Sequence, residues 1–362
     1  MLLRRLLTLK QKATSILQFP RITIEGNDGK FASPNNQTTN MEDSETGLTQ
    51  LSHQAITLPP QRNLNLSEAR IHSDMLLRLP FTKWTISSLN AASSTLTKLS
   101  LKMTVNANVT WKAFSRRLFL PLLKKFSLTN LSFLPVDVPE FVDIEIFLEN
   151  HPSIQDLCLY GVHLPASSEA IPRPTFRNLV KFNGHPYYVV WLLKSTKLDI
   201  TALPNLERVG ISSDCYAGSS RLPDYTLFEP ALEAIAGFGK NLDLAFTLNF
   251  RGSITFWFES HVLKAQSRGG SIFSQLTNVS TLVIYNAWYT PSMMAIFPEW
   301  LRLFPSLRHL RFERAGVVNV VCLTDTAFVS SVAKLCPSLE TMAVNQEPII
   351  DLRRMRRNRK DG

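Results

Sequence analysis

Two stretches of this chain, 32 residues apart, repeat one phrase. Residues 301–312 read LRLFPSLRHLRF and residues 333–344 read AKLCPSLETMAV. Each phrase runs from an amphipathic segment through Pro-Ser-Leu into an alternating apolar triplet. This spacing is too long for a hairpin and fits a strand followed by a helical return. The recurrence therefore constrains the fold more than any other feature of the sequence.

The apolar triplet recurs along most of the chain. In each copy an apolar residue is followed at the third and fifth positions by two more, and side-chain alternation puts these two on one face of a strand. Copies begin at Phe81 (an irregular member), Leu96, Leu123, Ile154, Leu179, Leu206, Ala245, Val279, Leu307 and Leu339. We predict strands near 99–101, 126–128, 157–159, 209–211, 282–284, 310–312 and 342–344. We predict full burial of Leu157, Leu159, Leu282, Ile284, Leu310 and Phe312.

The segments between the triplets have the pattern of helices that end at a proline. In DVPEFVDIEIFLENHPSIQDL, apolar residues recur at helical spacing from Phe141 to Leu148. Proline lacks an amide hydrogen and disfavours helix in the residue before it, so it terminates such a segment. Prolines of this kind are Pro152, Pro204, Pro305 and Pro337, and each is followed by Ser or Asn.

A unit of one helix and one strand cannot bury both elements alone, whereas stacked units bury a continuous core. The sequence therefore predicts an α/β fold: a solenoid with a parallel β-sheet on one face and helices on the other. The L-x-x-L-x-L pattern is that of leucine-rich repeats of the long, ribonuclease-inhibitor-like type. The Asn or Cys expected beyond each strand is mostly missing, so we expect an irregular horseshoe. A plain doubly wound βαβ domain is the structural alternative.

Part of the chain resembles a specific family. Residues 176–211, with LENHPSIQDLCLYGVHLP before them and LRLFPSLRHLRF after them, resemble fungal (mushroom-type) F-box-associated leucine-rich-repeat proteins over about residues 80–345. The resemblance implies an N-terminal F-box that docks on a ubiquitin-ligase adaptor and repeats that select a protein target. The F-box pattern itself is not evident. The opening MLLRRLLTLKQKATSILQFPRITIEG is a degenerate F-box remnant, a capping helix or a mitochondrial presequence.

The positive charge of the chain lies at its two ends. The net charge is +10; residues 1–24 hold five basic residues and no acid, and residues 351–362 hold six basic and two acidic residues, which leaves +1 for the rest. Nucleic-acid binding needs basic residues on a folded face, so we expect none. We predict a basic helix or F-box remnant over 1–25, a disordered linker over 26–60, the solenoid over 61–350 and a basic disordered tail over 351–362.

The sequence contains no common catalytic motif. It has no GxxxxGK[ST], GxGxxG, GxSxG or HExxH, and its histidines never pair at metal spacing. His151 and His185 each precede a proline and are interpreted as turn residues. Asp143, Glu145 and Glu149 are interpreted as a solvated helix face. We therefore expect no enzyme, no cofactor and no metal. No run of 18 apolar residues occurs, so no membrane partner is expected either.

The sequence predicts a non-catalytic protein-interaction module. The finer hypothesis is target recognition in an F-box/cullin-RING ubiquitin ligase, with the adaptor bound by the N-terminus. The alternative is a leucine-rich-repeat regulator that resembles small-GTPase activators. We expect a monomer in the cytoplasm or nucleus, or in mitochondria if residues 1–24 act as a presequence. The predicted strand register exposes one sheet face, where arginine and tyrosine favour binding. The candidate partner-binding residues are Tyr160, Arg208, Tyr285, His309 and Arg311.

Overall fold

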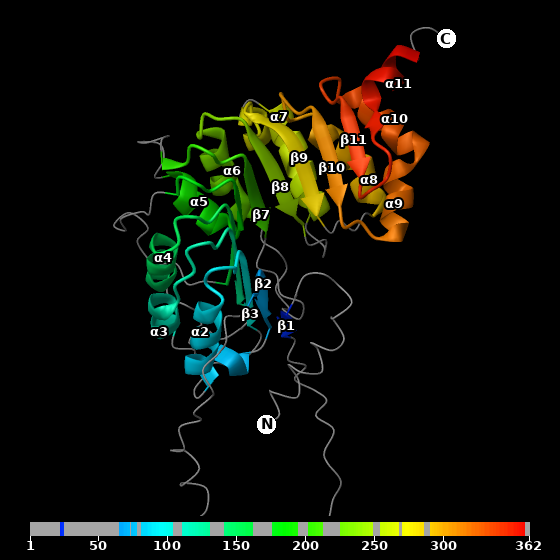
Figure 1. Cartoon of the computed structure of the whole chain (residues 1–362). Coiled ribbons are helices and arrows are strands. Elements are labelled where there is room, and N and C mark those ends of the chain that lie inside the picture. The colour runs from blue at the N-terminus through cyan, green and yellow to red at the C-terminus, as the bar shows by residue number, and fades with distance from the viewer. Residues whose placement is uncertain are drawn as a thin grey trace, which may run out of the picture.

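A twelve-stranded sheet runs through the described residues of the computed structural model (Figure 1). The structure describes residues 22–24, 65–72, 74–77, 81–103, 111–130, 141–161, 176–194, 202–212, 225–248, 254–267, 270–285 and 290–358. Strand order follows chain order. The strands are β1 (Ile22–Ile24), β2 (Glu68–Ile71), β3 (Lys98–Met103), β4 (Lys125–Asn130), β5 (Asp156–Tyr160), β6 (Lys181–Gly184), β7 (Arg208–Ser212), β8 (Leu242–Thr247), β9 (Val279–Tyr285), β10 (His309–Glu313), β11 (Thr341–Val344) and β12 (Ile350–Asp351).

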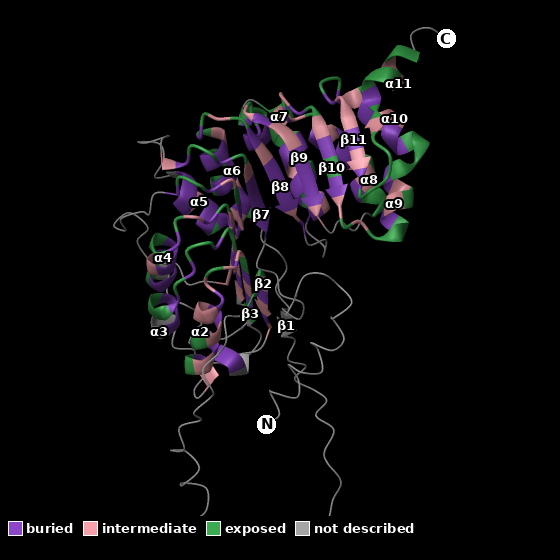
Figure 2. Cartoon of the chain, in the orientation of Figure 1, coloured by how far each residue is buried: buried purple, intermediate pink, exposed green. Residues whose placement is uncertain are grey.

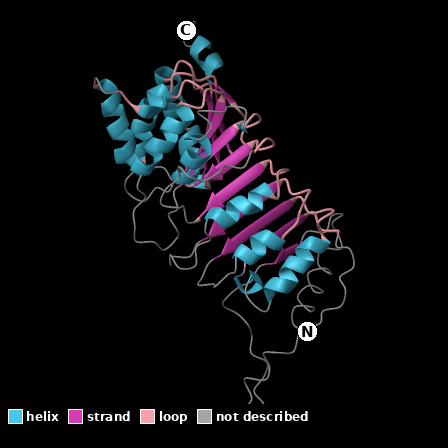
Figure 3. Ribbon diagram, turned by 90° about the vertical axis from the view of Figure 1, so that its left-hand side faces the viewer, coloured by secondary structure: helices cyan, strands magenta, loops and turns pink. Residues whose placement is uncertain are grey.

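Helices connect most successive strands and lie on one face of the sheet (Figure 3). The α-helices are α2 (Phe81–Ala91), α3 (Trp111–Arg117), α4 (Phe141–Glu149), α5 (Pro186–Lys194), α6 (Phe228–Ala236), α7 (Ile254–Gln266), α8 (Pro291–Leu301), α9 (Val317–Thr324), α10 (Thr326–Leu335) and α11 (Leu352–Asn358). Short 3-10 helices are η1 (Asp74–Leu77), η5 (Tyr225–Leu227) and η6 (Ile272–Gln275). No single described helix is long and apolar enough to cross a membrane, although the bent pair α9–α10 passes that test of length and composition.

Neighbouring strands from β1 to β11 pair in parallel, and β12 pairs with β11 antiparallel. Parallel pairing of successive strands with helical returns on one side confirms the predicted α/β solenoid and excludes the doubly wound alternative. The seven predicted strands lie within β3, β4, β5, β7, β9, β10 and β11.

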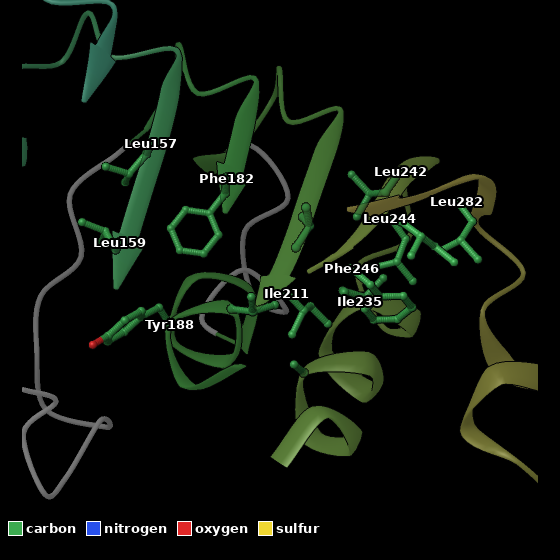
Figure 4. Close-up of a cluster of buried hydrophobic side chains, with 14 of the residues drawn as sticks. Leu157, Leu159, Phe182, Tyr188, Ile211, Ile235, Leu242, Leu244, Phe246 and Leu282 are labelled. Carbon is green, nitrogen blue, oxygen red and sulfur yellow. The ribbon is translucent and has the colours of Figure 1, made fainter. Parts of the chain in front are cut away.

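The core lies between the sheet and the helices (Figure 2). The six side chains predicted to be buried, from Leu157 to Phe312, are at most 1% exposed. Leu157, Leu159 and Leu282 point into this layer with Phe182 and Phe246 from β6 and β8 (Figure 4). The predicted register is therefore correct, because a slip of one residue would turn these side chains outward.

A ladder of turn side chains links successive units in the middle of the stack, each to the one before. The Asn178 amide donates to the Pro152 carbonyl (3.0 Å), and the Asn205 amide donates to the Arg177 carbonyl (2.7 Å). Asn278 Nδ2 donates to two carbonyls, those of Ile235 and Lys240, both at 2.9 Å. This ladder precedes the strands, whereas the asparagine sought in the sequence pattern follows them. It gives turn carbonyls a hydrogen-bond donor from the next unit and so links neighbouring turns.

Two repeat assignments are wrong. Phe81 begins helix α2, because Thr82, Thr85, Ile86 and Leu89 form a buried stripe at helical spacing. The copy placed at Ala245 belongs to β8, where Leu244 and Phe246 pair with Leu282 and Ile284 of β9. The register shifts between Leu242 and Asp243, so one residue is missing between the first two apolar positions. A fixed spacing of three therefore misses this strand.

The predicted boundaries also differ from the structure at both ends. The predicted disordered tail contains the end of β12 and the whole of α11, and Leu352 at the start of α11 is fully buried. These elements cover the last edge of the sheet, which is why a basic segment is ordered here. The predicted basic helix over 1–25 and linker over 26–60 lie outside the described residues, except that residues 22–24 form β1.

The solvated-face interpretation fails for two acids of α4. Asp143 and Glu145 are 8% and 4% exposed, and only Glu149 lies in solvent. Asp143 is in the first turn of α4, where the helix dipole favours a carboxylate. α4 packs beside α3, so one of its flanks is covered in addition to its apolar stripe.

We predict that Leu310→Ala lowers the free energy of unfolding by about 2–5 kcal/mol, because it leaves a cavity beneath β10. Val321→Ala is the matched control: it also removes a few methyl groups, but Val321 is 66% exposed on α9. Urea titration of both variants measures the difference. Equal stability of the two variants would contradict the burial of β10.

A second prediction concerns acid. Burial, with a smaller contribution from the Lys264 charge, lowers the pKa of His261 to about 4, against an opposing effect of Glu229. The His261 ring is 1% exposed, and its Nδ1 lies 3.0 Å from Ser271 Oγ. Burial also lowers the pKa of His185 to about 4. Because the unfolded chain binds these protons first, stability is full above about pH 6.5 and falls as the pH drops toward 4.

The measurement is the melting temperature of wild type and of His261→Asn between pH 7 and pH 4. Asparagine retains a group near Ser271 and does not titrate, so His261→Asn should lose up to about 3 kcal/mol less stability than wild type over this range. Leu310→Ala controls for destabilisation, since its loss should be the same at every pH. Parallel pH profiles for wild type and His261→Asn would refute a neutral His261.

Candidate interaction surface

The side chains of β2–β11 that point away from the helices form what we call the open face. Because the strands share one register, these side chains align in rows across the sheet. The first row, at the strand entrances, is Glu68, Lys98, Lys125, Asp156, Lys181, Arg208, Asp243, Thr281, His309 and Thr341. The middle row is Arg70, Ser100, Ser127, Cys158, Asn183, Gly210, Ala245, Val283, Arg311 and Ala343.

The middle row is flat from β3 to β8, because its side chains there are small. The Asn183 side chain lies over Gly210 and leaves no room for a larger residue there. A Cβ at position 210 would lie 2.5 Å from Asn183 Oδ1. Cys158 in this row is not a nucleophile. Burial raises the pKa of its thiol to about 11, despite hydrogen bonds with Ser127 and Tyr160 that lower it. The middle row from β3 to β8 therefore gives a partner a flat surface without a reactive thiol.

A group of charged and aromatic side chains, which we call the polar cluster, spans β7 to β10. It consists of Arg208, Asp243, Tyr285, Arg311 and Glu313. Arg208 Nη2 lies 3.1 Å from Asp243 Oδ2, and Arg311 Nη2 lies 3.0 Å from Glu313 Oε1. Arg208 and Glu313 both act on the pKa of the Tyr285 hydroxyl, so this tyrosine lies beside both ion pairs. The cluster is thus an electrostatic network of neighbouring side chains.

The electrostatics of the network keep its members in fixed protonation states. Burial, followed by the Glu313 charge, raises the pKa of Tyr285, so its hydroxyl stays protonated. Burial lowers the pKa of Arg208, but the hydrogen bond and charge of Asp243 outweigh it and raise the pKa overall. Arg314, in the left-handed conformation (φ 59°), places its guanidinium 5.8 Å from the Tyr285 ring centroid. This contact places one cation over the aromatic ring.

The structure places the five predicted residues on the open face but does not gather them all. Arg208, Tyr285 and Arg311 belong to the polar cluster. His309 Nδ1 lies 2.9 Å from Thr341 Oγ1, at the edge of the cluster. Tyr160 is on β5, two strands from Arg208, and contacts Cys158 instead.

Exposure on the open face is less uniform than alternation predicts. Gly210, Ser212 and Val283 point away from the core in the predicted register, yet all three are buried, Val283 completely. For Gly210 the reason is the Asn183 side chain above it. Sequence reasoning missed Asn183 and Asp243 as parts of this surface. Asp243 was missed because the apolar residues of β8 are more closely spaced than the pattern used to find strands. Only the Leu-x-Leu-x-Phe alternation after Asn241 indicates that a strand begins there.

Within the described residues no group of three or more His, Cys, Asp or Glu side chains is placed to hold a metal ion. Two buried polar atoms of the open face, Asn183 Oδ1 and Arg208 Nε, have no hydrogen-bond partner among the described residues.

Comparison with known proteins gives a fold-level likeness. No family model matches the chain, and no curated protein matches it. Among solved structures, the leucine-rich repeat-containing protein LegL7 from Legionella pneumophila is similar, with a TM-score of 0.45 and 12% sequence identity. The match covers 81% of this chain and 91% of that chain.

We predict that Arg208 and Asp243 are energetically coupled. A double-mutant cycle with Arg208→Ala and Asp243→Ala should give a coupling of about 0.5–1.5 kcal/mol, because both side chains are less than about a third exposed. The control pair is Arg302 and Glu299, 3.8 Å apart and 65% and 39% exposed, which should couple by less than about 0.3 kcal/mol. Urea unfolding of each cycle provides the values; equal couplings would mean that the network is not formed.

Proposed function

We propose that this chain is a non-catalytic protein-interaction module whose polar cluster binds a partner protein. The observation that carries the proposal is the two ion pairs of the polar cluster with Tyr285 beside them, which strands β7 to β10 place on the open face. Arginine and tyrosine dominate binding energy at interfaces, especially where their conformations are fixed before binding. Strands position such groups more rigidly than loops do.

The members of the network differ in what they offer a partner. The Arg311 side chain is 49% exposed and free to gain contacts, whereas Arg208 at 21% is held by Asp243. Tyr285 is half-buried and adds an aromatic surface beside Arg314. The flat middle row next to the cluster lets a partner segment approach the sheet closely. A partner with both acidic and apolar groups is the best complement.

The context that we propose for this module is target recognition in an F-box/cullin-RING ubiquitin ligase. It is supported by the resemblance carried by residues 176–211 and by the Leu-rich basic opening of the chain. The small-GTPase regulator alternative is less well supported, because activators of that kind carry an acidic segment after their repeats, whereas α11 after the last repeat of this chain is basic.

The test of the binding surface starts from a partner identified by cross-linking to the full chain. Alanine substitution of Arg311 or Tyr285 should weaken binding of that partner by more than about 2 kcal/mol. Alanine at Tyr160 and Arg208 completes the series. Lys334→Ala, exposed on α10 on the helical face, is the control and should change affinity by less than about 0.5 kcal/mol. Affinity unchanged at all four positions would move the site off the sheet.

The ubiquitin-ligase context needs a separate experiment. The full chain should bind a purified cullin-RING adaptor, and deletion of residues 1–21 should abolish that binding while leaving β1 in place. Titration calorimetry measures both. A chain that binds its target through Arg311 but never binds the adaptor would retain the interaction module and exclude the ligase role.

A further inference from the structure

A cavity of about 650 Å³ lies at the last edge of the solenoid, away from the polar cluster. One wall consists of two successive Pro-Ser turns, Pro305–Ser306 and Pro337–Ser338, which are the repeated phrase of the sequence. The other wall is α11, which Figure 1 shows beside α10 at the C-terminal end. Both walls are held by the stack: the N–H of Leu352 donates to the Glu340 carbonyl at 2.9 Å.

The lining of the cavity is strongly positive. Four arginines, Arg308, Arg353, Arg356 and Arg357, face a single acid, Glu340. Glu340 pairs with Arg353 and lies 3.9 Å from Arg308. One carboxylate cannot neutralise four guanidinium groups, so the cavity keeps an excess of three positive charges.

Arg356 is a fixed part of this cavity. Its guanidinium donates to the carbonyls of Ala333 (3.2 Å), Cys336 (3.3 Å) and Leu339 (2.6 Å) at and beyond the end of α10. These carbonyls carry partial negative charge, which orients the guanidinium without neutralising it. Arg356 therefore attaches α11 to the stack and leaves its charge in the cavity.

Arg308 and Arg357 are the groups available to a ligand. The Arg308 side chain is 64% exposed and has only the loose contact with Glu340. Arg357 is exposed and has no ion-pair partner in the described part of the chain. A guanidinium binds carboxylate or phosphate oxygens in a bidentate manner, so these two side chains are suited to an anionic group.

We propose that this cavity binds an anionic peptide segment of a partner protein through Arg308 and Arg357. The anionic group is a phosphorylated side chain or adjacent carboxylates, which share the same oxygen chemistry. The volume exceeds that of a single inorganic ion and accommodates part of a polypeptide. A nucleic-acid backbone fits less well, because it needs a longer row of unpaired basic residues, whereas Arg208 and Arg311 on the open face are already paired with acids.

The test measures fluorescence anisotropy of the full chain with short labelled Gly-Ser peptides. One peptide carries a central phosphoserine, one carries adjacent glutamates at that position, and one is neutral. We expect the phosphoserine and glutamate peptides to bind at least about tenfold more tightly than the neutral peptide, and to weaken between about 50 and 200 mM salt. The better of the two identifies the source of the anionic group.

The variants separate this site from general electrostatics. The double variant Arg308→Ala, Arg357→Ala should lose at least about tenfold in affinity for the anionic peptides. Arg302→Ala is the matched control: Arg302 is 65% exposed and 3.8 Å from Glu299, nearly the same environment as Arg308, but it does not line the cavity. Its affinity should stay within about twofold of wild type. If the alanine double variant melts early, Arg308→Gln, Arg357→Gln replaces it.

Four results would overturn the proposal. The first is equal binding of neutral and anionic peptides, and the second is equal loss in the double variant and Arg302→Ala. The third is inorganic phosphate that binds as tightly as the phosphoserine peptide, which would make this an ion site. The fourth is a single-stranded DNA that displaces the peptide and binds more tightly. None of these outcomes depends on the polar cluster, so the site can fail while the proposed function stands.

Discussion

One hydrogen-bond arrangement at the strand entrances sets the geometry on which the rest of the molecule depends. The Thr97 carbonyl accepts the N–H groups of Lys124 and Lys125, and the Lys124 carbonyl accepts those of Gln155 and Asp156. The same arrangement recurs at Gln155, Val180 and Arg308. These bonds fix the first residue of each strand against the start of the preceding strand. All ten parallel pairings of the described sheet therefore share one register apart from the shift in β8. Both the buried leucine rows and the open-face rows follow from this.

The turn side chains explain how irregular repeats still stack. Ser153, Asn178, Asn205, Lys240 and Asn278 differ in chemistry, yet each donates to a carbonyl in or near the preceding turn. Stacking of the turns therefore requires a side-chain donor that reaches a carbonyl of the preceding turn, and this donor need not be asparagine. Since each unit contacts mainly its neighbours, helices of different length between these turns are tolerated.

The two proposed binding surfaces use different consequences of stacking. The polar cluster depends on the register, which brings Arg208, Asp243 and Tyr285 together from positions 35 to 77 residues apart. The arginine-lined cavity depends on the end of the stack, where β12 and α11 cover the last strand and bring basic side chains beside exposed turns. The polar cluster offers a partner side chains that are already in ion pairs, whereas the cavity offers guanidinium groups in excess of its acids.

The sequence by itself determined the class of fold, most strands and the buried rows, because alternation and proline stops act over a few residues and are repeated often enough to average out exceptions. It also selected Arg208, Tyr285 and Arg311 as outward-facing. Only the tertiary structure decided which side chains contact one another. Asp243, the partner of Arg208, lies in the strand with irregular spacing, and Tyr160 lies two strands away from Arg208. The order of the tail was likewise decided by tertiary structure. A run of arginines indicates disorder on local grounds, but an uncovered sheet edge and the open carbonyls of α10 provide the partners that fold it.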